Sequence, residues 1–331
     1  MSFPQRSKPI DLKGRRIFVT GGTGFLGRSL LDYLLEAESI YDEMPQVTLL
    51  SRSPAQFLLR FPEYADHSWL NLVQGDLEHL PQVTPGTYTD IIHGAADTHK
   101  SDDSKLWLSQ LVDGTRNVLE FADRVHVNRL LFISSGAVYG AQLPNVKSLR
   151  ESQPFAPLPT GITSTYGHGK RMAEQLCTLY AAQSKDVECV IARCFAIVSR
   201  HIPFDGPYAV GNFMRDALAG QGIHISGNGQ TIRSYIAGRD MAHWLFTLLY
   251  RGRSGEAYNV GSHQPISTLE LATLIRDIVG IDQSILVGNS VDSSGRSFYL
   301  PCTEKAQELD LSVETSLRDE LMDIARVRQA G

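Results

Sequence analysis

Near its N-terminus the chain reads Arg16-Ile17-Phe18-Val19-Thr20-Gly21-Gly22-Thr23-Gly24-Phe25-Leu26-Gly27. The apolar run before the glycines predicts a β-strand, and the apolar spacing over residues 30–35 predicts a helix behind them. Glycines adopt backbone angles closed to larger residues, and their missing side chains let backbone N–H groups approach a pyrophosphate. A plain strand-to-helix turn is the alternative. The order of strand, glycine turn and helix favours a dinucleotide site built on Gly21, Gly24 and Gly27.

The composition argues against several classes of protein. The 331 residues are 42% hydrophobic, enough for a sizeable core, and the net charge of −5 argues against a general nucleic-acid or anionic-membrane binder. The four cysteines lack zinc-ligand spacing, so we expect no metal. No run reaches the roughly 18 apolar residues of a membrane span, and residues 1–13 lack the apolar core of a signal peptide. We therefore expect a soluble cytoplasmic protein with no nucleic-acid or membrane partner.

Strand-like and helix-like segments alternate through the first two-thirds of the chain. Strands are predicted at Arg16–Thr20, Val47–Ser51, Ser68–Gln74, Asp90–Ala95, Arg129–Ser134 and Val187–Cys194, with helices between them, notably at Leu106–Val125 and Tyr166–Ala182. This alternation is typical of an α/β fold with a Rossmann-type doubly wound parallel sheet. We assign residues 1–196 to a dinucleotide-binding domain, to which residues 233–261 return. Residues 197–331 are assigned mainly to a smaller C-terminal α/β lobe that binds the substrate.

Three residues could carry chemistry in this framework. Tyr166 and Lys170 lie four residues apart on a predicted helix and therefore share one face. An ammonium near a phenol favours the phenolate and so eases proton exchange, although an ordinary surface pair is the alternative. Ser135 follows the predicted strand at residues 129–134. A hydroxyl at the carboxyl end of a parallel strand points into the crevice where such sheets bind ligands.

Together these segments resemble the extended short-chain dehydrogenase/reductase family, in its nucleotide-sugar branch, over essentially the whole chain. Further matching segments are Gly75-Asp76-Leu77, Ile92-His93-Gly94-Ala95-Ala96, Gly114-Thr115-Arg116-Asn117-Val118-Leu119-Glu120, Asn212-Phe213-Met214, Gly227-Asn228-Gly229-Gln230-Thr231-Ile232-Arg233-Ser234-Tyr235-Ile236 and Tyr258-Asn259-Val260-Gly261. The resemblance implies that Ser135 polarises a carbonyl and that Tyr166 donates or accepts the proton. It also implies that Lys170 tunes the phenol and holds the nicotinamide ribose.

The same resemblance implies which residues bind the two ligands. The cofactor residues would be Gly21, Gly24, Phe25, Leu26, Gly27, Ser51, Arg52, Asp76, Leu77, Ala95, Ala96, Tyr166 and Lys170. Among these, Asp76 would face the adenine. The nucleotide-sugar residues would be Thr98, Asn212, Arg233 and Arg296, with Arg233 at the diphosphate and Arg296 near the nucleotide end.

Two departures from the family pattern bear on the reaction. NAD-preferring members carry an acid at the position of Ser51, and its absence beside Arg52, which could pair with a 2′-phosphate, favours NADP(H) over NAD(H). Sugar 4,6-dehydratases of the family place Asp and Glu after the active-site hydroxyl, where this chain has Gly136 and Ala137. Glycine and alanine cannot supply the additional acid–base groups that dehydration needs.

We therefore expect NADPH-dependent reduction, at C4, of a nucleoside-diphosphate 4-keto-6-deoxyhexose. Around the active-site serine and tyrosine the chain is similar to the CDP-abequose synthase group of reductases, whose products enter lipopolysaccharide. The alternative is a nucleoside-diphosphate-sugar 4-epimerase with tightly held NAD, because an epimerase returns the hydride that it borrows. A non-catalytic NADP-sensing module is a third hypothesis, disfavoured because Tyr166 and Lys170 are both present. Family members often dimerise through the helices that correspond to residues 106–125 and 166–182, so we expect a homodimer.

Overall fold

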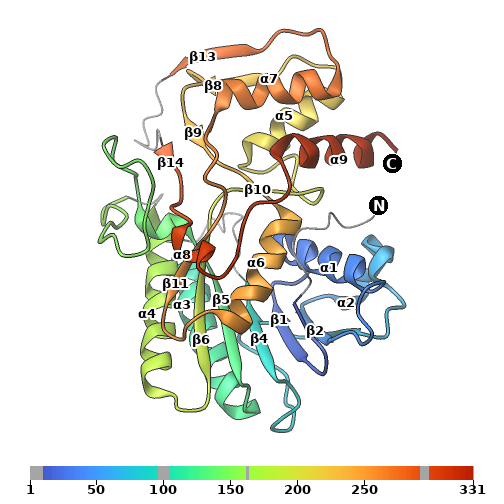
Figure 1. The fold of residues 1–331 in the computed structure, drawn as a ribbon, viewed down its shortest axis with the longest axis vertical. Helices are drawn as coiled ribbons and strands as arrows, with labels where there is room; N and C mark the ends of the chain where they lie inside the picture. The colour runs from blue at the N-terminus through green and yellow to red at the C-terminus, as the bar shows by residue number, and fades with distance from the viewer. Residues whose placement is uncertain (1–9, 96–103, 162–163, 291–297, 331) are drawn as a thin grey trace.

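The computed structural model describes residues 10–95, 104–161, 164–290 and 298–330 (Figure 1). Its centre is one seven-stranded sheet with the strand order β3-β2-β1-β4-β5-β6-β11. Every neighbouring pair in this sheet is parallel, so crossovers connect successive strands. The strands are β1 (Arg16–Thr20), β2 (Gln46–Ser51), β3 (Leu70–Gln74), β4 (Asp90–His93), β5 (Arg129–Ser135), β6 (Glu188–Cys194) and β11 (Ala257–Val260).

Helices cover both faces of this sheet. Strand β1 shows why the sequence requires it: Ile17 and Val19 are buried in the core that contains α1 and α6, whereas Phe18 is buried in the core that contains α3. Apolar side chains on both sides of a strand are the pattern of a parallel sheet buried on both faces. The first face carries α1 (Phe25–Ala37), α2 (Pro54–Arg60), η1 (Pro62–Tyr64) and α6 (Gly238–Arg251); the second carries α3 (Ser104–Val125) and α4 (Thr165–Gln183).

A smaller lobe with its own apolar core stands above the sheet in Figure 1. Its core side chains include Met214, Leu271 and Ile324, which are fully buried. The lobe helices are α5 (Ala209–Leu218), α7 (Thr268–Val279) and α9 (Leu317–Ala330). Short strands complete it: β8 (His224–Gly227) with β13 (Leu286–Ser290), and β9 (Ile232–Arg233) between β12 (Ile266–Ser267) and β14 (Phe298–Tyr299). The remaining short elements are η2 (Gly136–Tyr139), β7 (Ile197–Val198), β10 (Ile236–Ala237) and α8 (Glu304–Gln307).

The predicted fold class is confirmed, since the chain forms a Rossmann-like parallel sheet with helices on both faces and a smaller C-terminal α/β part. Strand β11 pairs with β6, so residues 257–260 return to the N-terminal sheet after the chain has entered the lobe. The division of the chain at residue 196 stays an interpretation.

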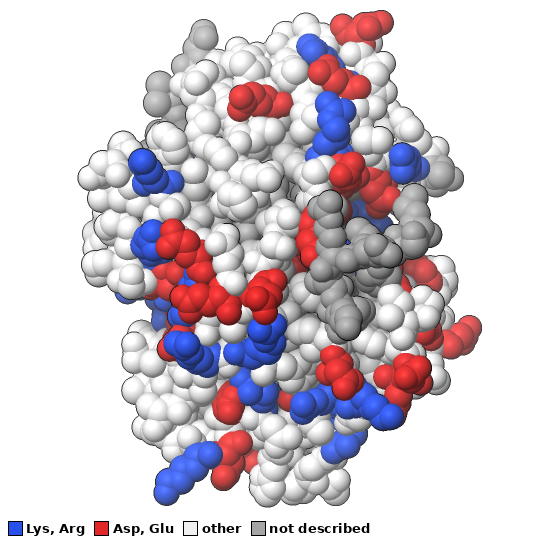
Figure 2. All heavy atoms as spheres, viewed as in Figure 1, with Lys and Arg blue, Asp and Glu red and all other residues white. Residues whose placement is uncertain are grey.

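The surface mixes charges of both signs. On the face drawn in Figure 2, Lys and Arg lie in small groups among Asp and Glu rather than in one continuous basic area. Pairs such as Arg150–Glu304 and Lys305–Glu256 compensate one another, with N···O distances of 2.7 and 3.0 Å. Within the described residues, every helix is too short or too polar to cross a bilayer.

Candidate functional site

A cavity of about 1740 Å³ opens where β1, β2, β4 and β5 end and continues beneath the smaller lobe. The strands β1 and β4 are neighbours in the sheet, but the helices that follow them, α1 and α3, cover opposite faces. The cavity lies at this point, where open α/β sheets bind ligands. A site for one drug-sized ligand occupies about 300–1,000 Å³. The cavity is therefore large enough for a dinucleotide and a second ligand together.

The glycine turn forms the floor of this cavity. Gly21 has a left-handed φ of +76°, and a Cβ on it would lie 2.6 Å from the backbone nitrogen of Ala95. A Cβ on Gly27 would collide with the backbone of Gly21 and Gly22, which holds α1 tightly against the end of β1. Gly24 precedes α1 and has no side chain to cap its first N–H groups. This bare helix N-terminus fits the pyrophosphate of a dinucleotide.

His93 fixes the junction between β1 and β4. Its Nδ1 lies 2.7 Å from Thr20 Oγ1 and its Nε2 lies 3.1 Å from Thr115 Oγ1 on α3. Thr115 donates its own proton to the carbonyl of Leu111, and Thr20 Oγ1 accepts from the backbone N–H of Ala95. His93 therefore donates from Nε2, and Thr20 Oγ1 has a proton that it can donate to Nδ1 of the neutral ring. Burial, reinforced by the charge of Lys170, lowers the pKa of His93 to about 3. This histidine is structural and positions the loop at Ala95.

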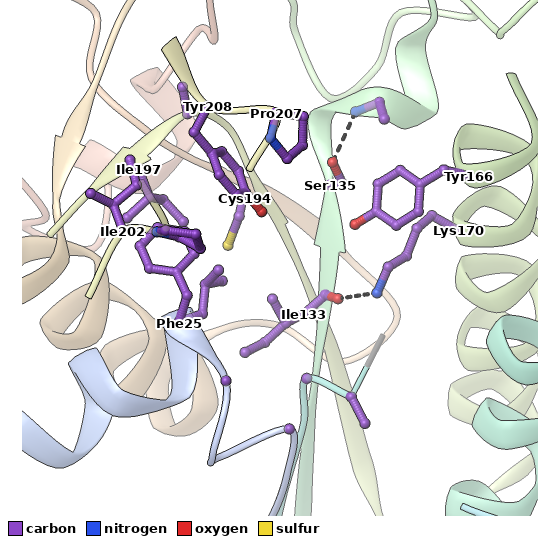
Figure 3. Close-up of a pocket in the computed structure, with 18 of the residues that line it drawn as sticks. Phe25, Ile133, Ser135, Tyr166, Lys170, Cys194, Ile197, Ile202, Pro207 and Tyr208 are labelled. Carbon is purple, nitrogen blue, oxygen red and sulfur yellow. Dashed lines mark hydrogen bonds between the residues drawn. The ribbon is translucent and has the colours of Figure 1, made fainter. Parts of the chain in front are cut away.

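Ser135, Tyr166 and Lys170 line one wall of the cavity together (Figure 3). Ser135 ends β5, and its Oγ accepts a hydrogen bond of 3.2 Å from the N–H of Ala137. Tyr166 lies in the first turn of α4 with its hydroxyl directed into the cavity beside Ser135. Burial raises the pKa of the Tyr166 phenol, and a side-chain hydrogen bond to Ser135 opposes that shift. The phenol is therefore held in its neutral, proton-donating form.

Lys170 follows one helical turn later and is only 2% exposed. Its Nζ donates a hydrogen bond of 2.8 Å to the carbonyl of Ile133 and lies 6.0 Å from the centre of the Tyr166 ring. Burial lowers the pKa of Lys170 to about 8. A cation held this close to a phenol stabilises the phenolate when the proton leaves.

Aromatic side chains line the cavity beside Tyr166, and of these Phe25 was predicted from the sequence and the others were not. The indole of Trp107 stacks on the Tyr166 ring with centroids 5.5 Å apart and an interplanar angle of 18°. Tyr208 and Tyr299 line the same cavity from the smaller lobe, and the half-buried Phe25 lines it from α1. Aromatic residues are common in any core, so the sequence does not show which of them lie beside Tyr166; the folded structure does.

Tyr299 and Phe195 also explain why residue 136 is glycine. A Cβ on Gly136 would lie 2.9 Å from Phe195 Cζ and would collide with the Tyr299 hydroxyl. The aromatic pair, with ring centroids 4.7 Å apart, thus occupies the space that a side chain at this position would need. Ala137 lines the cavity with a methyl group. Neither residue brings an acid to the site.

At the end of β2 the cavity is basic. Ser51 is buried, and its Oγ accepts a hydrogen bond of 3.2 Å from the N–H of Ser53. Arg52 is exposed beside it and lines the cavity, together with Arg28 of α1 and Arg60 of α2. Arg52 could be identified from the sequence, but the other two arginines could not, because no local motif connects α1 with the far end of α2.

Asp76 and Leu77 form the facing rim after β3. Partial burial raises the pKa of the Asp76 carboxyl, but bonds from the N–H groups of His79 and Glu78 outweigh it and leave the pKa below the usual range. Asp76 Oδ1 accepts from these N–H groups at 2.7 and 2.9 Å. Leu77 is held by α3, because its carbonyl accepts a 2.8 Å hydrogen bond from Asn117. The structure thus presents both residues to the cavity on a rigid turn.

The residues predicted for the substrate are only partly described. Asn212 on α5 donates to the carbonyl of Gly206 at 3.2 Å, and Arg233 on β9 lies with its guanidinium 5.7 Å from the centre of the Tyr299 ring. Both line the cavity on the lobe side. Thr98, Arg296 and the cofactor residue Ala96 lie outside the described residues. The binding roles of all these residues stay predictions.

Potential metal ligands are dispersed in this structure. Across residues 10–95, 104–161, 164–290 and 298–330, no three His, Cys, Asp or Glu side chains gather in a way that could hold a metal ion. The four cysteines are all buried as free thiols.

Comparison with known proteins gives a family match and several relatives. The model of the NAD dependent epimerase/dehydratase family matches residues 17–261. The chain is 28% identical over 310 residues to UDP-glucuronic acid decarboxylase 6 of Arabidopsis thaliana, covering 93% of this chain and 87% of the relative. It is 27% identical over 317 residues to dTDP-glucose 4,6-dehydratase of Streptomyces niveus, covering 93% and 91%.

Solved structures show the same fold. The UDP-glucose 4-epimerase of Thermotoga maritima aligns with a TM-score of 0.79 at 20% identity, over 95% of this chain and 99% of that one. The UDP-N-acetylglucosamine 4-epimerase of Methanobrevibacter ruminantium aligns with a TM-score of 0.83 at 18% identity, over 96% and 98%. At these identities the likeness establishes the fold and leaves the substrate to be argued from the site.

Proposed function

Because the chain belongs to the NAD dependent epimerase/dehydratase family, we propose that it transfers a hydride at C4 of a nucleoside-diphosphate sugar. We propose more specifically that it reduces a nucleoside-diphosphate 4-keto-6-deoxyhexose with NADPH. A bound nicotinamide would supply the hydride. The observation that carries the reductase assignment is the basic end of β2, where Ser51 and Arg52 stand in place of an acid.

The three residues on the cavity wall would share the proton chemistry. Tyr166, kept neutral by burial, would donate its proton to the oxygen that develops negative charge, and Ser135 would stabilise that oxygen by a hydrogen bond. Lys170 would stabilise the phenolate left behind and position α4 against β5. The stacked indole of Trp107 would restrict water around the phenol. Asn212 and Arg233, on the lobe side, would bind the nucleotide-sugar diphosphate.

The site argues against elimination. One relative is named a 4,6-dehydratase, but Gly136 and Ala137 offer no acid–base group here. Phe195 and Tyr299 also occupy the space next to Gly136, so a carboxylate would not fit there without rearrangement. The reaction proposed for this chain therefore stops at oxidoreduction.

A 4-epimerase is the second candidate, and the comparisons by themselves favour it over the reductase. The matching family is named for epimerases and dehydratases, and two solved 4-epimerases share the fold. The same three residues would serve it, because epimerisation removes and returns a hydride at one carbon. It would require NAD to be held through the whole cycle rather than exchanged.

One experiment separates the candidates. The purified protein is denatured and its retained dinucleotide is identified by mass spectrometry, and NADPH oxidation is then followed with CDP-, dTDP-, GDP- and UDP-4-keto-6-deoxyhexoses. The reductase predicts sub-stoichiometric cofactor and NADPH consumption with at least one of these sugars. Stoichiometric NAD together with interconversion of UDP-sugars would establish the epimerase instead. Release of CO₂ from UDP-glucuronic acid would overturn both.

A further inference from the structure

Arg28 is a partly buried cation at the edge of the cavity, and within the described residues it forms no direct ion pair with the acids near it, Asp32 and Glu63. Over the part of the chain that the structure describes, its Nε is buried and has no hydrogen-bond partner. Its Nη2 reaches only the carbonyl of His201, at 3.4 Å. The nearest acid on the same helix, Asp32, is already bonded to Arg200 and His201 at 2.6–2.8 Å. The unpartnered Nε of this partly buried guanidinium is a donor that an anionic ligand could use.

A second arginine is held next to it. The Arg28 guanidinium lies over the ring of Phe61 at 4.2 Å from the centroid, and that of Arg60 lies over the same ring at 5.3 Å. Burial lowers the pKa of Arg28 and the charge of Arg60 lowers it further, while Tyr64, Asp32 and Glu63 partly oppose the shift. Two like charges on one aromatic ring repel each other. An anion between them would convert this repulsion into attraction.

We propose that Arg28 and Arg60, supported by Phe61, form with Arg52 a binding site for a phosphate monoester. The ligand chemistry is a dianion, which guanidinium groups recognise through paired N–H donors. Of the phosphates on a dinucleotide, the 2′-phosphate of NADP(H) fits best. Arg52 directly follows β2, and α2 leads from there to Arg60 and Phe61, so the three arginines surround the end of the strand where the adenosine ribose is bound in such folds.

The pyrophosphate is the other possible partner, but it has its own site. The bare N-terminus of α1 at Gly24 offers backbone N–H groups for it. Arg28 lies one turn further along α1, and its guanidinium is directed to Phe61 beyond α2. The assignment of the arginines to the 2′-phosphate rests on the proposed use of NADPH.

The test measures binding directly by calorimetry, with NADPH, NADH, 2′,5′-ADP and 5′-AMP as ligands. The variants are Arg28→Gln, Arg60→Gln and Arg52→Ala. Arg124→Gln is the matched control, because Arg124 lies over Phe121 in the same geometry, at 5.2 Å, but away from the cavity. Each variant is first checked for an unchanged thermal unfolding profile. Arg60 is exposed, so the Arg60→Gln variant keeps the proposal testable if Arg28→Gln does not fold.

We expect the wild type to bind NADPH more tightly than NADH. Arg28→Gln and Arg60→Gln should each weaken NADPH and 2′,5′-ADP at least tenfold, with NADH and 5′-AMP changed less than twofold and the control unchanged. Equal weakening of NADPH and NADH would assign Arg28 to the pyrophosphate and overturn the proposal. A wild type that binds 2′,5′-ADP no more tightly than 5′-AMP would overturn it as well. Failure of the ketosugar assay with this binding pattern intact would overturn the proposed reaction alone.

Discussion

The Nζ of Lys170 donates a 2.8 Å hydrogen bond to the carbonyl oxygen of Ile133, two residues before Ser135 on β5. This bond ties the helix that carries Tyr166 to the strand that carries Ser135. It also holds a cation in a place that is only 2% exposed, where burial lowers the lysine pKa to about 8. The buried lysine therefore positions the site but lowers the stability of the folded protein.

Lys170→Met should therefore stabilise the protein while it removes activity. Burial lowers the pKa of Lys170 from 10.5 in the unfolded chain to about 8 in the folded protein. Above pH 10.5 the amine is neutral in both states and the burial has no electrostatic cost. As pH falls towards 8 the unfolded chain becomes protonated first, so the free energy of unfolding decreases. At pH 7 this pKa shift lowers the free energy of unfolding by about 3 kcal/mol, and methionine would remove that cost. Losing the hydrogen bond to Ile133 would cancel about 1 kcal/mol of the gain. We expect urea denaturation at pH 7 to show a gain of about 2 kcal/mol. A loss of stability would show that Lys170 is well solvated or paired when folded.

Tyr166→Phe should lower turnover by roughly 10²–10⁴-fold, because it removes the proposed proton donor and leaves the ring in place. The Trp107 stack depends on the ring, so dinucleotide binding should change less than twofold. Steady-state kinetics with the best sugar substrate and fluorescence titration with NADPH measure the two effects separately. Turnover within a factor of three of wild type would remove Tyr166 from the mechanism.

Six of the seven strands of the central sheet could be predicted, because each is a short apolar run that ends at a turn signal, whereas β11 was not predicted as a strand. The observed β5 extends one residue beyond the predicted Arg129–Ser134. The structure shows that α7 begins with a reciprocal capping box between Ser267 and Glu270. Helix α9 was not predicted, because its many charged residues obscure the apolar stripe that packs on the lobe.

Some residues of the site could likewise be predicted from the sequence and others could not. Ser135, Tyr166 and Lys170 could be placed from the sequence, because each follows from a strand end or a helical spacing. Trp107 and Arg28 could not, because they come from helices whose contacts with Tyr166 and Phe61 depend on the packing of distant segments. Asp76 was assigned to the adenine, and the structure adds that its carboxylate also caps its own turn.

His93 should make the protein less stable in mild acid. Burial holds its native pKa near 3, below the unfolded value of about 6.5, so its contribution is present above pH 6.5 and is lost as pH falls. Between pH 7.5 and 5 the loss from this residue should be about 2 kcal/mol. Denaturation curves of wild type and His93→Gln across this range measure the difference in slope. Parallel slopes would mean that the pKa of His93 is the same in the folded and the unfolded protein.

The outer faces of α3 and α4 lead to the last prediction, that the protein is a homodimer. These helices pack on each other through Gly169, where a Cβ would lie 2.6 Å from Leu111 Cδ1. Beyond that contact the side chains of Leu106, Met172 and Leu179 are 48%, 54% and 48% exposed.

Apolar side chains on the neighbouring surfaces of two packed helices favour burial against a second copy. We expect light scattering to give twice the mass of the 36.6 kDa chain. A Met172→Glu, Leu179→Glu double variant should shift the mass to that of one chain. Leu59→Glu, at a site that is 85% exposed on α2, is the matched control and should leave the dimer intact. A monomeric wild type at micromolar concentration would contradict the prediction.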